Sequence, residues 1–212
     1  MSGGFRRQVL GLGTVLVLLT TSLPAFAQSS AVTIRGEGLF GYQHFLASET
    51  FKAIFGTANT FIYGGGVDVG FQKRWFVRVD ATRFKKTGER AFVTNGIVSS
   101  LGIPLTVTIT PITFVGGYRA PFAPAKPPAR GSRVPPRKPP TVFWYVGGGA
   151  GSWAYSESTD DPSESFSERK IGYIGLGGVE WRLQKYIALG FEGQYASVPS
   201  ALSGGDFFPA PT

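Results

Sequence analysis

The 212-residue sequence contains no cysteine and a single histidine, His44. A chain without thiols forms no disulfide and offers no thiolate metal site, and one histidine cannot build a His-rich metal centre. The lack of cysteine also excludes a cysteine nucleophile. No phosphate-binding loop or dinucleotide fingerprint is present, because the Gly-Gly-Gly runs do not stand between a strand and a helix. We therefore expect no metal site and no cofactor.

One catalytic arrangement remains open on residue type alone. An acyl hydrolase can use Ser, His and a carboxylate, and His44, Ser48 and Glu49 lie close together in the sequence. A triad is recognised by geometry rather than by spacing, so this proximity is weak evidence. We expect His44 to be a solvated loop histidine, near the end of the first strand or in the loop that follows it. We expect no residue to be catalytic and the protein not to be an enzyme.

Long apolar runs are also scarce. Arg6 and Arg7 precede an uncharged apolar run, residues 9–19, and the small-residue pattern 25–27 follows it. This order is typical of a secretory signal peptide, and the run is shorter than the roughly 20 residues of a membrane-spanning helix. We expect residues 1–27 to be the signal peptide, with cleavage after Ala27, and residues 28–212 to form one domain. That domain has no apolar stretch of about 18 residues, so it would enter a membrane only as strands.

The formal charge of +8 is concentrated in two places. Arg6 and Arg7 leave with the signal peptide, and five more cations lie in one proline-rich stretch without an acid, which leaves about +1 for the rest. The five are Lys126, Arg130, Arg133, Arg137 and Lys138. A basic nucleic-acid face over the whole fold is therefore not indicated. Residues 119–141 are rich in Pro, Lys and Arg and are expected to be an extended linker.

Glycine and aromatic residues are abundant, with 30 Gly, 18 Phe, 8 Tyr and 4 Trp. Apolar and polar residues alternate through most of the chain after residue 31, and helical periodicity is hard to find there. The pattern predicts an all-β protein with seven readable strands. They cover roughly residues 32–45, 60–72, 75–94, 97–118, 141–155, 169–183 and 186–197.

The connections alternate in length. Short turns follow the second strand, at Lys73-Arg74, and the sixth, at Gln184-Lys185, whereas longer loops lie on the other side, and Asn95-Gly96 is a strong hairpin signal. Strands of about ten residues or a little longer can cross an outer membrane. Short turns on one side and long loops on the other are typical of an antiparallel up-and-down transmembrane β-barrel.

Four segments carry a resemblance to a known family: Tyr63-Gly-Gly-Gly-Val-Asp-Val-Gly-Phe71, Trp75-Phe-Val-Arg-Val-Asp80, Tyr145-Val-Gly-Gly-Gly-Ala-Gly151 and Gly175-Leu-Gly-Gly-Val-Glu-Trp181. With the signal peptide, the chain resembles the small outer-membrane β-barrel proteins of the OmpA/OmpX-like kind. The resemblance implies a location in the bacterial outer membrane, contact with its lipid, a monomer, eight strands and a structural or surface-interaction role. Only seven strands are readable, and single-chain bacterial barrels have even strand numbers. We expect a truncation near Ala201, or a makeshift eighth strand at residues 200–209.

Alternation places eight charged side chains inside such a barrel: Arg35, Glu37, Asp68, Arg78, Asp80, Glu180, Arg182 and Glu192. An eight-stranded barrel is only just wide enough for side chains to fill it, so we expect these charges to pair across the lumen as a structural network that plugs it. The alternative is a narrow path that makes the protein a small channel for ions or solutes. A third possibility is a secreted soluble calyx that binds an apolar ligand.

The basic linker is the one segment with an expected partner. Its five cations could contact peptidoglycan or anionic lipid head groups, each worth about 1 kcal/mol near an anionic surface. The alternative is an insertion without a partner. We expect no nucleic-acid partner.

Overall fold

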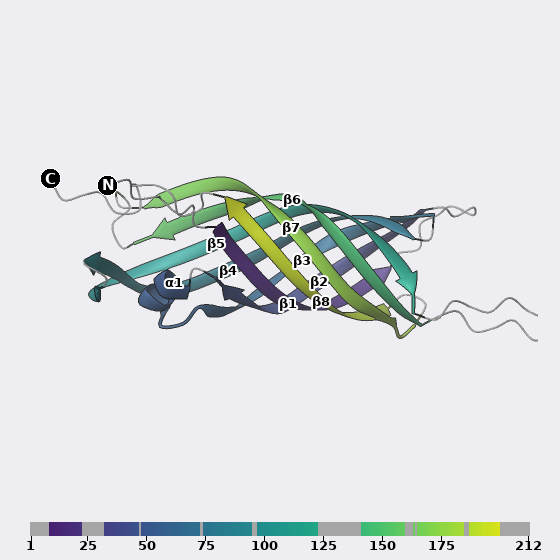
Figure 1. The fold of residues 1–212 in the computed structure, drawn as a ribbon, viewed down its shortest axis with the longest axis horizontal. Helices are drawn as coiled ribbons and strands as arrows, with labels where there is room; N and C mark the ends of the chain where they lie inside the picture. Colours follow the sequence, from purple (N-terminus) through teal and green to yellow (C-terminus); the bar gives the residue numbers. More distant parts are fainter. Residues whose placement is uncertain are drawn as a thin grey trace, which may run out of the picture.

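The computed structural model describes residues 9–22, 32–46, 48–72, 74–94, 97–122, 141–159, 163, 165–184 and 187–199. Eight strands form one closed antiparallel barrel in which each strand pairs with its neighbours in the sequence and β1 pairs with β8 (Figure 1). The strands are β1 (Val9–Ser22), β2 (Val32–Phe45), β3 (Asn59–Phe71), β4 (Trp75–Thr94), β5 (Ile97–Pro121), β6 (Val142–Ser158), β7 (Phe166–Arg182) and β8 (Ile187–Pro199). The predicted up-and-down barrel is confirmed.

The seven strands expected from alternation correspond to β2–β8, and the bounds of β2 and β4 are those predicted. β5 runs to Pro121, however, so residues 119–121 belong to a strand rather than to the linker. Proline had marked this stretch as strand-free, yet Pro121 stands at the last position of β5. Residues 123–140, with the five linker cations, lie outside the described part of the chain.

The eighth place in the barrel belongs to the apolar N-terminal run. β1 pairs with β2 from Leu12↔Phe45 to Ser22↔Arg35, and with β8 from Val9↔Pro199 onward. The expected makeshift strand at residues 200–209 lies outside the described residues. The signal peptide stays a prediction, since it concerns processing during export.

A short helix, α1 (Ser48–Phe55), lies in the loop between β2 and β3. No helix was expected there, and that expectation was wrong, because eight residues are too few for helical periodicity to show in the sequence. α1 lies at the end of the barrel where β2 ends, opposite the turn between β3 and β4 (Figure 1). No helix in the described segments is long and apolar enough to span a membrane.

Two rows of aromatic side chains divide the outer surface of the barrel. One row lies at the end of the barrel that carries the turn between β3 and β4, which we call the turn end. The ring of Tyr118 there lies 5.2 Å from that of Trp75 and 5.8 Å from that of Trp144. Nearer to α1, Phe40 stacks on Phe61 at 5.8 Å. On β7 the two rows are represented by Trp181 and Tyr173, both exposed. Eight residues of strand span about 26 Å, which a tilt near 40° reduces to about 20 Å, close to the apolar band of roughly 25 Å that membrane barrels carry.

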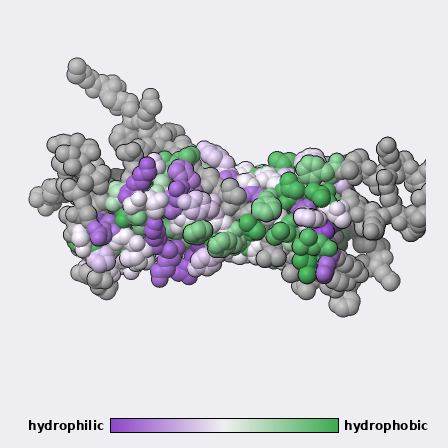
Figure 2. Space-filling view, turned by 90° about the horizontal axis from the view of Figure 1, so that it is seen from below, coloured by the Kyte–Doolittle hydropathy of each residue, from purple (hydrophilic) through white to green (hydrophobic). Residues whose placement is uncertain are grey.

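We call the part of the wall between these two rows the membrane half. Apolar side chains face outward there. Val67, Val79, Phe114, Val146 and Phe191 are all exposed there. All the charged side chains predicted to face inward, except Arg182, are buried in the same part of the wall. Figure 2 shows the hydrophobic surface gathered mostly toward the end away from α1 and the hydrophilic surface toward the other end. This sidedness is that of a strand wall in lipid.

The part of the barrel beyond the row of Phe40 and Phe61, toward α1, is called the outer half. There the arrangement is reversed, with apolar side chains facing the lumen and polar side chains facing outward. Leu105, Val107 and Ile109 are buried inside, whereas Thr106 and Thr108 on the same strand face outward. β4 has 20 residues and spans roughly 66 Å, whereas about 9–11 residues are enough to cross a membrane. The outer half therefore has the wall of a barrel in water, with an apolar core.

The two prolines of β5 disturb its pairing with β4. Pro104 pairs with Glu89 at a register shift between Glu89 and Ala91, and no pairs are formed between β4 and Pro111. Proline lacks the amide hydrogen that a ladder needs.

Candidate functional site in the barrel lumen

Five strands bring charged side chains into the lumen of the membrane half. All eight residues predicted to face inward take part in ion pairs there, and they are contributed by β2, β3, β4, β7 and β8. Seven of the eight are less than a tenth exposed, and the exception is Arg182. Alternation is the reason: side chains at every second position point to the same side of the wall.

One cluster surrounds Arg78, which is 2 % exposed. Its Nη1 and Nη2 donate to the two oxygens of Glu192, each at 2.8 Å. Its Nε lies 2.8 Å from Asp80 Oδ2 and 3.2 Å from Glu37 Oε1. Gln194 Nε2 also donates to Glu192 Oε1, at 2.6 Å. A single guanidinium thus faces three carboxyl groups.

A second cluster lies nearer the turn end. Arg35 Nη2 donates to Asp68 Oδ1 at 3.0 Å, and its Nη1 donates to Glu180 Oε2 at 2.9 Å. Arg182 Nε donates to Glu180 Oε1 at 3.0 Å, with 43 % of its side chain exposed. Arg182 therefore lies at the mouth of the lumen, and the guanidinium packs over the ring of Phe143.

One member of this second cluster, Arg119, was not predicted from the sequence. Its Nη2 donates to Asp68 Oδ2 at 2.9 Å, and its Nε lies 3.6 Å from Glu180 Oε2. The guanidinium also lies over the rings of Phe76 and Tyr145, at 5.0 and 5.7 Å from their centroids. The alternation Val115, Gly117, Arg119 on the inward face would have found it.

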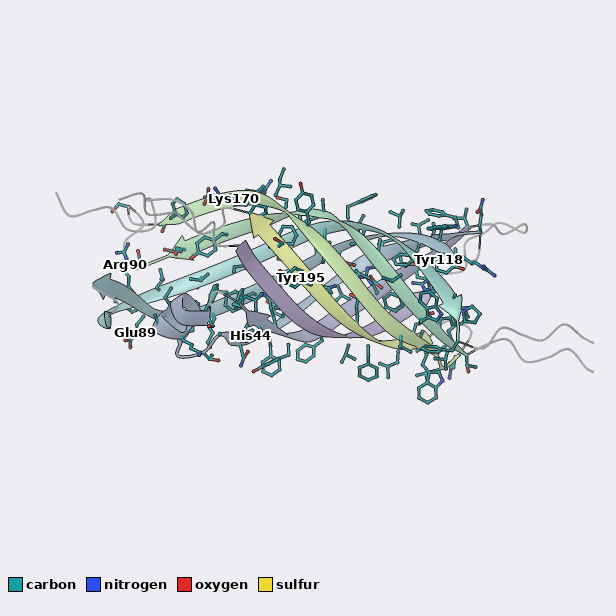
Figure 3. All side chains as sticks on the ribbon, in the orientation of Figure 1. His44, Glu89, Arg90, Tyr118, Lys170 and Tyr195 are labelled. Atoms are coloured by element: carbon teal, nitrogen blue, oxygen red, sulfur yellow. The ribbon has the colours of Figure 1, made fainter. Side chains whose placement is uncertain are left out.

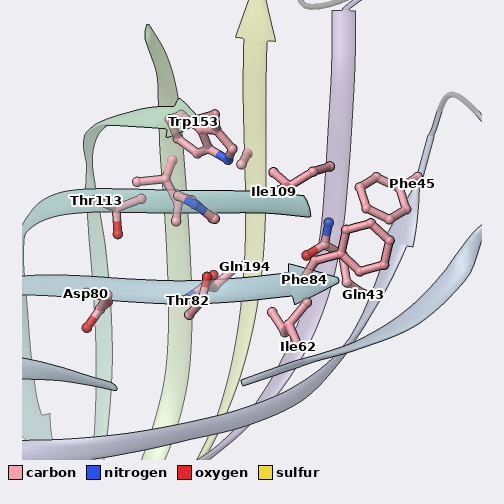
Figure 4. Close-up of a pocket in the computed structure, with 13 residues that line it drawn as sticks. Gln43, Phe45, Ile62, Asp80, Thr82, Phe84, Ile109, Thr113, Trp153 and Gln194 are labelled. Carbon is pink, nitrogen blue, oxygen red and sulfur yellow. The ribbon is translucent and has the colours of Figure 1, made fainter. Parts of the chain in front are cut away.

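Above the Arg78 cluster the lumen contains a small cavity of about 40 Å³. Figure 4 shows Asp80 and Thr113 at one end of it and Phe45 with Phe84 at the other. A few water molecules fit in such a volume, whereas pockets for drug-sized ligands measure about 300–1,000 Å³. A ligand-binding calyx is therefore not formed in this part of the lumen.

The outer end of the lumen is filled by α1. Phe51 of the helix stacks on Phe45 with 3.8 Å between the ring centroids, and Phe55 meets Phe84 edge-to-face at 5.9 Å. Lys86, an inward-facing residue of β4, has its Nζ over the ring of Phe55, 5.6 Å from the centroid. We refer to Phe45, Phe51, Phe55 and Phe84 as the phenylalanine plug.

The residues considered for acyl hydrolysis do not form a described site. His44 is exposed on the outward face, and its Nδ1 lies 2.6 Å from Asn59 Oδ1 (Figure 3). Ser48 is the first residue of α1, and the side chain of Glu49 is outside what the structure describes. Among the described residues no group of three or more His, Cys, Asp or Glu side chains is placed to hold a metal ion.

Comparison with known proteins gives one family. Residues 13–207 match the model of the outer membrane protein beta-barrel domain. No curated protein matches the sequence.

Among solved structures, two of Ail, the attachment invasion locus protein of Yersinia pestis, are similar. The structure with the heparin analogue sucrose octasulfate has 11 % identity, covers 90 % of this chain and 99 % of that chain, and has a TM-score of 0.36. The other has 10 % identity, covers 90 % and 98 %, and has a TM-score of 0.28. At these TM-scores the likeness carries no argument about function.

Proposed function

Because the chain belongs to the outer membrane protein beta-barrel domain family, we propose that this outer-membrane barrel has a structural or surface-interaction role and a lumen closed by its own side chains. The protein lies in the bacterial outer membrane. The observation that carries the proposal is the reversal of sidedness between the membrane half and the outer half. A wall with an apolar interior and a polar exterior is suited to water, so the outer half extends the barrel beyond the lipid.

The outward face of the outer half offers polar and basic side chains to a partner. Arg83 and Lys85 of β4 are exposed there, beside Thr106 and Thr108 of β5. In the membrane half, by contrast, the outward-facing side chains are apolar. This surface is therefore the part of the wall that meets the environment, and its charge favours acidic partners.

Single cysteines test this arrangement cleanly, because the chain has none of its own. In intact cells a membrane-impermeant maleimide should label Thr108→Cys. The matched position Arg74→Cys, in the turn at the opposite end, should react only after the cells are permeabilised. Labelling of Arg74→Cys but not Thr108→Cys in intact cells would show the outer half on the periplasmic side and overturn the surface role.

The closed lumen is supported by three layers of side chains, namely the second cluster, the Arg78 cluster and the phenylalanine plug. The alternative, a small channel, needs water to pass all three. Planar bilayers distinguish the two: we expect no steady conductance from the protein. Step-like openings that disappear on crosslinking α1 to β4 would favour the channel instead.

The remaining alternatives have less support. A secreted soluble calyx needs an apolar lumen throughout and charges in water, and only the outer half has that sidedness. We infer that the protein is not an enzyme, since the outward-facing imidazole of His44 is hydrogen-bonded to Asn59 rather than to a described serine.

The basic linker is the proposed periplasmic contact. β5 ends and β6 begins at the end of the barrel that carries the short turn between β3 and β4. We expect deletion of residues 124–140 to weaken pull-down by isolated peptidoglycan at low salt, and exchange of the five cations for glutamine to do the same. Unchanged pull-down by both variants would remove this contact.

A further inference from the structure

The carboxyl groups of the lumen outnumber its cations. The two clusters together contain five carboxyl groups and four guanidiniums, counted over the described side chains: Glu37, Asp68, Asp80, Glu180 and Glu192 against Arg35, Arg78, Arg119 and Arg182. If all were ionised, the network would carry a net charge of −1. An unpaired charge is costly in a lumen surrounded by lipid.

The excess lies at the Arg78 cluster. Arg78 has given both of its terminal nitrogens to Glu192. The contacts of Arg78 with the other two acids are made through Nε, which carries a single N–H and lies 3.2 Å from Glu37 Oε1 and 2.8 Å from Asp80 Oδ2. Neither contact has hydrogen-bond geometry, so Glu37 Oε1 and both oxygens of Asp80 are buried without a hydrogen-bond donor. The side chains of Glu37 and Asp80 are 3 % and 4 % exposed.

The two carboxyl groups are also neighbours, because Glu37 Oε1 and Asp80 Oδ2 both lie against the same nitrogen, Arg78 Nε. Two ionised carboxylates so placed repel, whereas a protonated carboxyl donates to an ionised one. We propose that the folded barrel binds one proton between Glu37 and Asp80, where it supplies the missing donor and brings the charge of the whole network to zero.

A metal cation is a poorer occupant of this place. No set of three acidic or histidine side chains converges on a common point among the described residues, and the guanidinium of Arg78 lies between the acids. A proton needs no such space. The titratable and charged side chains around the pair are Asp68 on β3, Arg78 on β4, Tyr145 on β6 and Glu192 on β8, together with the second cluster below.

Proton linkage gives the test. Unfolded Asp and Glu lose their protons near pH 4, so above that pH the folded state would hold one proton that the unfolded state lacks. The stability that this proton contributes is complete below about pH 4 and falls as the pH rises, and this loss increases the unfolding equilibrium constant about tenfold per pH unit. His44 is the only histidine, so a His44→Gln background leaves the chain without an imidazole.

In this background, urea unfolding in lipid vesicles should show the tenfold dependence between pH 6 and pH 8. Glu37→Gln and Asp80→Asn should each abolish it. The control Glu168→Gln, whose carboxyl lies outside the two clusters and is paired with Lys170, should retain it. A cluster completed by water alone takes up no proton, so a flat profile, or a slope that persists in both variants, overturns the proposal.

Infrared spectroscopy provides a second measurement that does not depend on the variants folding. The folded wild-type protein should show the carbonyl stretch of a protonated carboxyl group at pH 7, and this band should be lost in Glu37→Gln and Asp80→Asn where they fold. Absence of the band from the wild-type protein at pH 7 overturns the proposal.

Discussion

Arg119, at the end of β5, donates to Asp68 on β3 across the lumen, with 2.9 Å between Nη2 and Oδ2. Asp68 also accepts from Arg35, so the carboxylate is held between two guanidiniums. With Glu180 on β7, this arrangement links β2, β3, β5 and β7 across the lumen. It explains why a residue beside the proline-rich linker is 9 % exposed.

Replacement of Arg119 by Gln should destabilise the barrel by about 3–5 kcal/mol. The reason is that the buried carboxylates of Asp68 and Glu180 lose one of their cationic partners. Arg74→Gln is the matched control, since the guanidinium of Arg74 is exposed and donates to the hydroxyl of Tyr118. This change should alter stability by less than about 0.5 kcal/mol. Urea unfolding of both variants in vesicles gives the two values. Equal midpoints would show that Arg119 contributes no more than a surface arginine.

The sequence contains most of the fold but not all of the lumen. Alternation locates β2–β8 because each strand has unlike faces, and it identifies charges such as Arg78 and Glu192 as inward-facing by the same rule. Arg119 was not predicted to face inward, because the end of its strand lies in a segment whose composition indicates a linker. The change from apolar side chains facing outward to apolar side chains facing the lumen was not predicted either, because alternation in β5 is equally regular whether Leu105 or Thr106 faces the lumen.

The position of the lipid predicts a contrast between two outward-facing residues of β5. Phe114→Arg places a cation in the membrane half and should cost about 2–4 kcal/mol. Thr108→Arg places the same side chain in the outer half, where water reaches it, and should change stability by less than about 0.5 kcal/mol. The measurement is the unfolding free energy in vesicles, and similar costs at both positions would mean that the membrane boundary lies elsewhere.

α1 is predicted to depend on the small size of Gly88. A Cβ at this inward-facing position would overlap the carbonyl oxygen of Ile54 and the ring of Phe55. Gly88→Val should therefore displace the helix at a cost of about 1–3 kcal/mol, which corresponds to roughly ten- to hundredfold faster amide exchange in residues 48–55. Gly116→Val is the control, because a Cβ there meets nothing within 4 Å. Unchanged exchange in Gly88→Val would show that the helix is not held against β4.

The last prediction concerns the segment that is both the expected signal peptide and β1. We expect the protein recovered from outer-membrane fractions to begin at Gln28, which intact-mass measurement would show directly. The chain from Gln28 onward contains the seven strands β2–β8, and without β1 the edges of β2 and β8 have no described partner. Unpaired backbone groups are not tolerated in lipid.

The same fraction, run boiled and unboiled on a gel, completes this test, because a closed barrel resists SDS until it is heated. A heat-dependent shift of a chain that begins at Gln28 would mean that β2 and β8 find each other or another strand in the membrane. A shift together with an intact N-terminus would contradict the cleavage prediction and make β1 a permanent strand of the barrel. Cleavage without any shift would mean that the strand wall does not close once residues 9–22 have been removed.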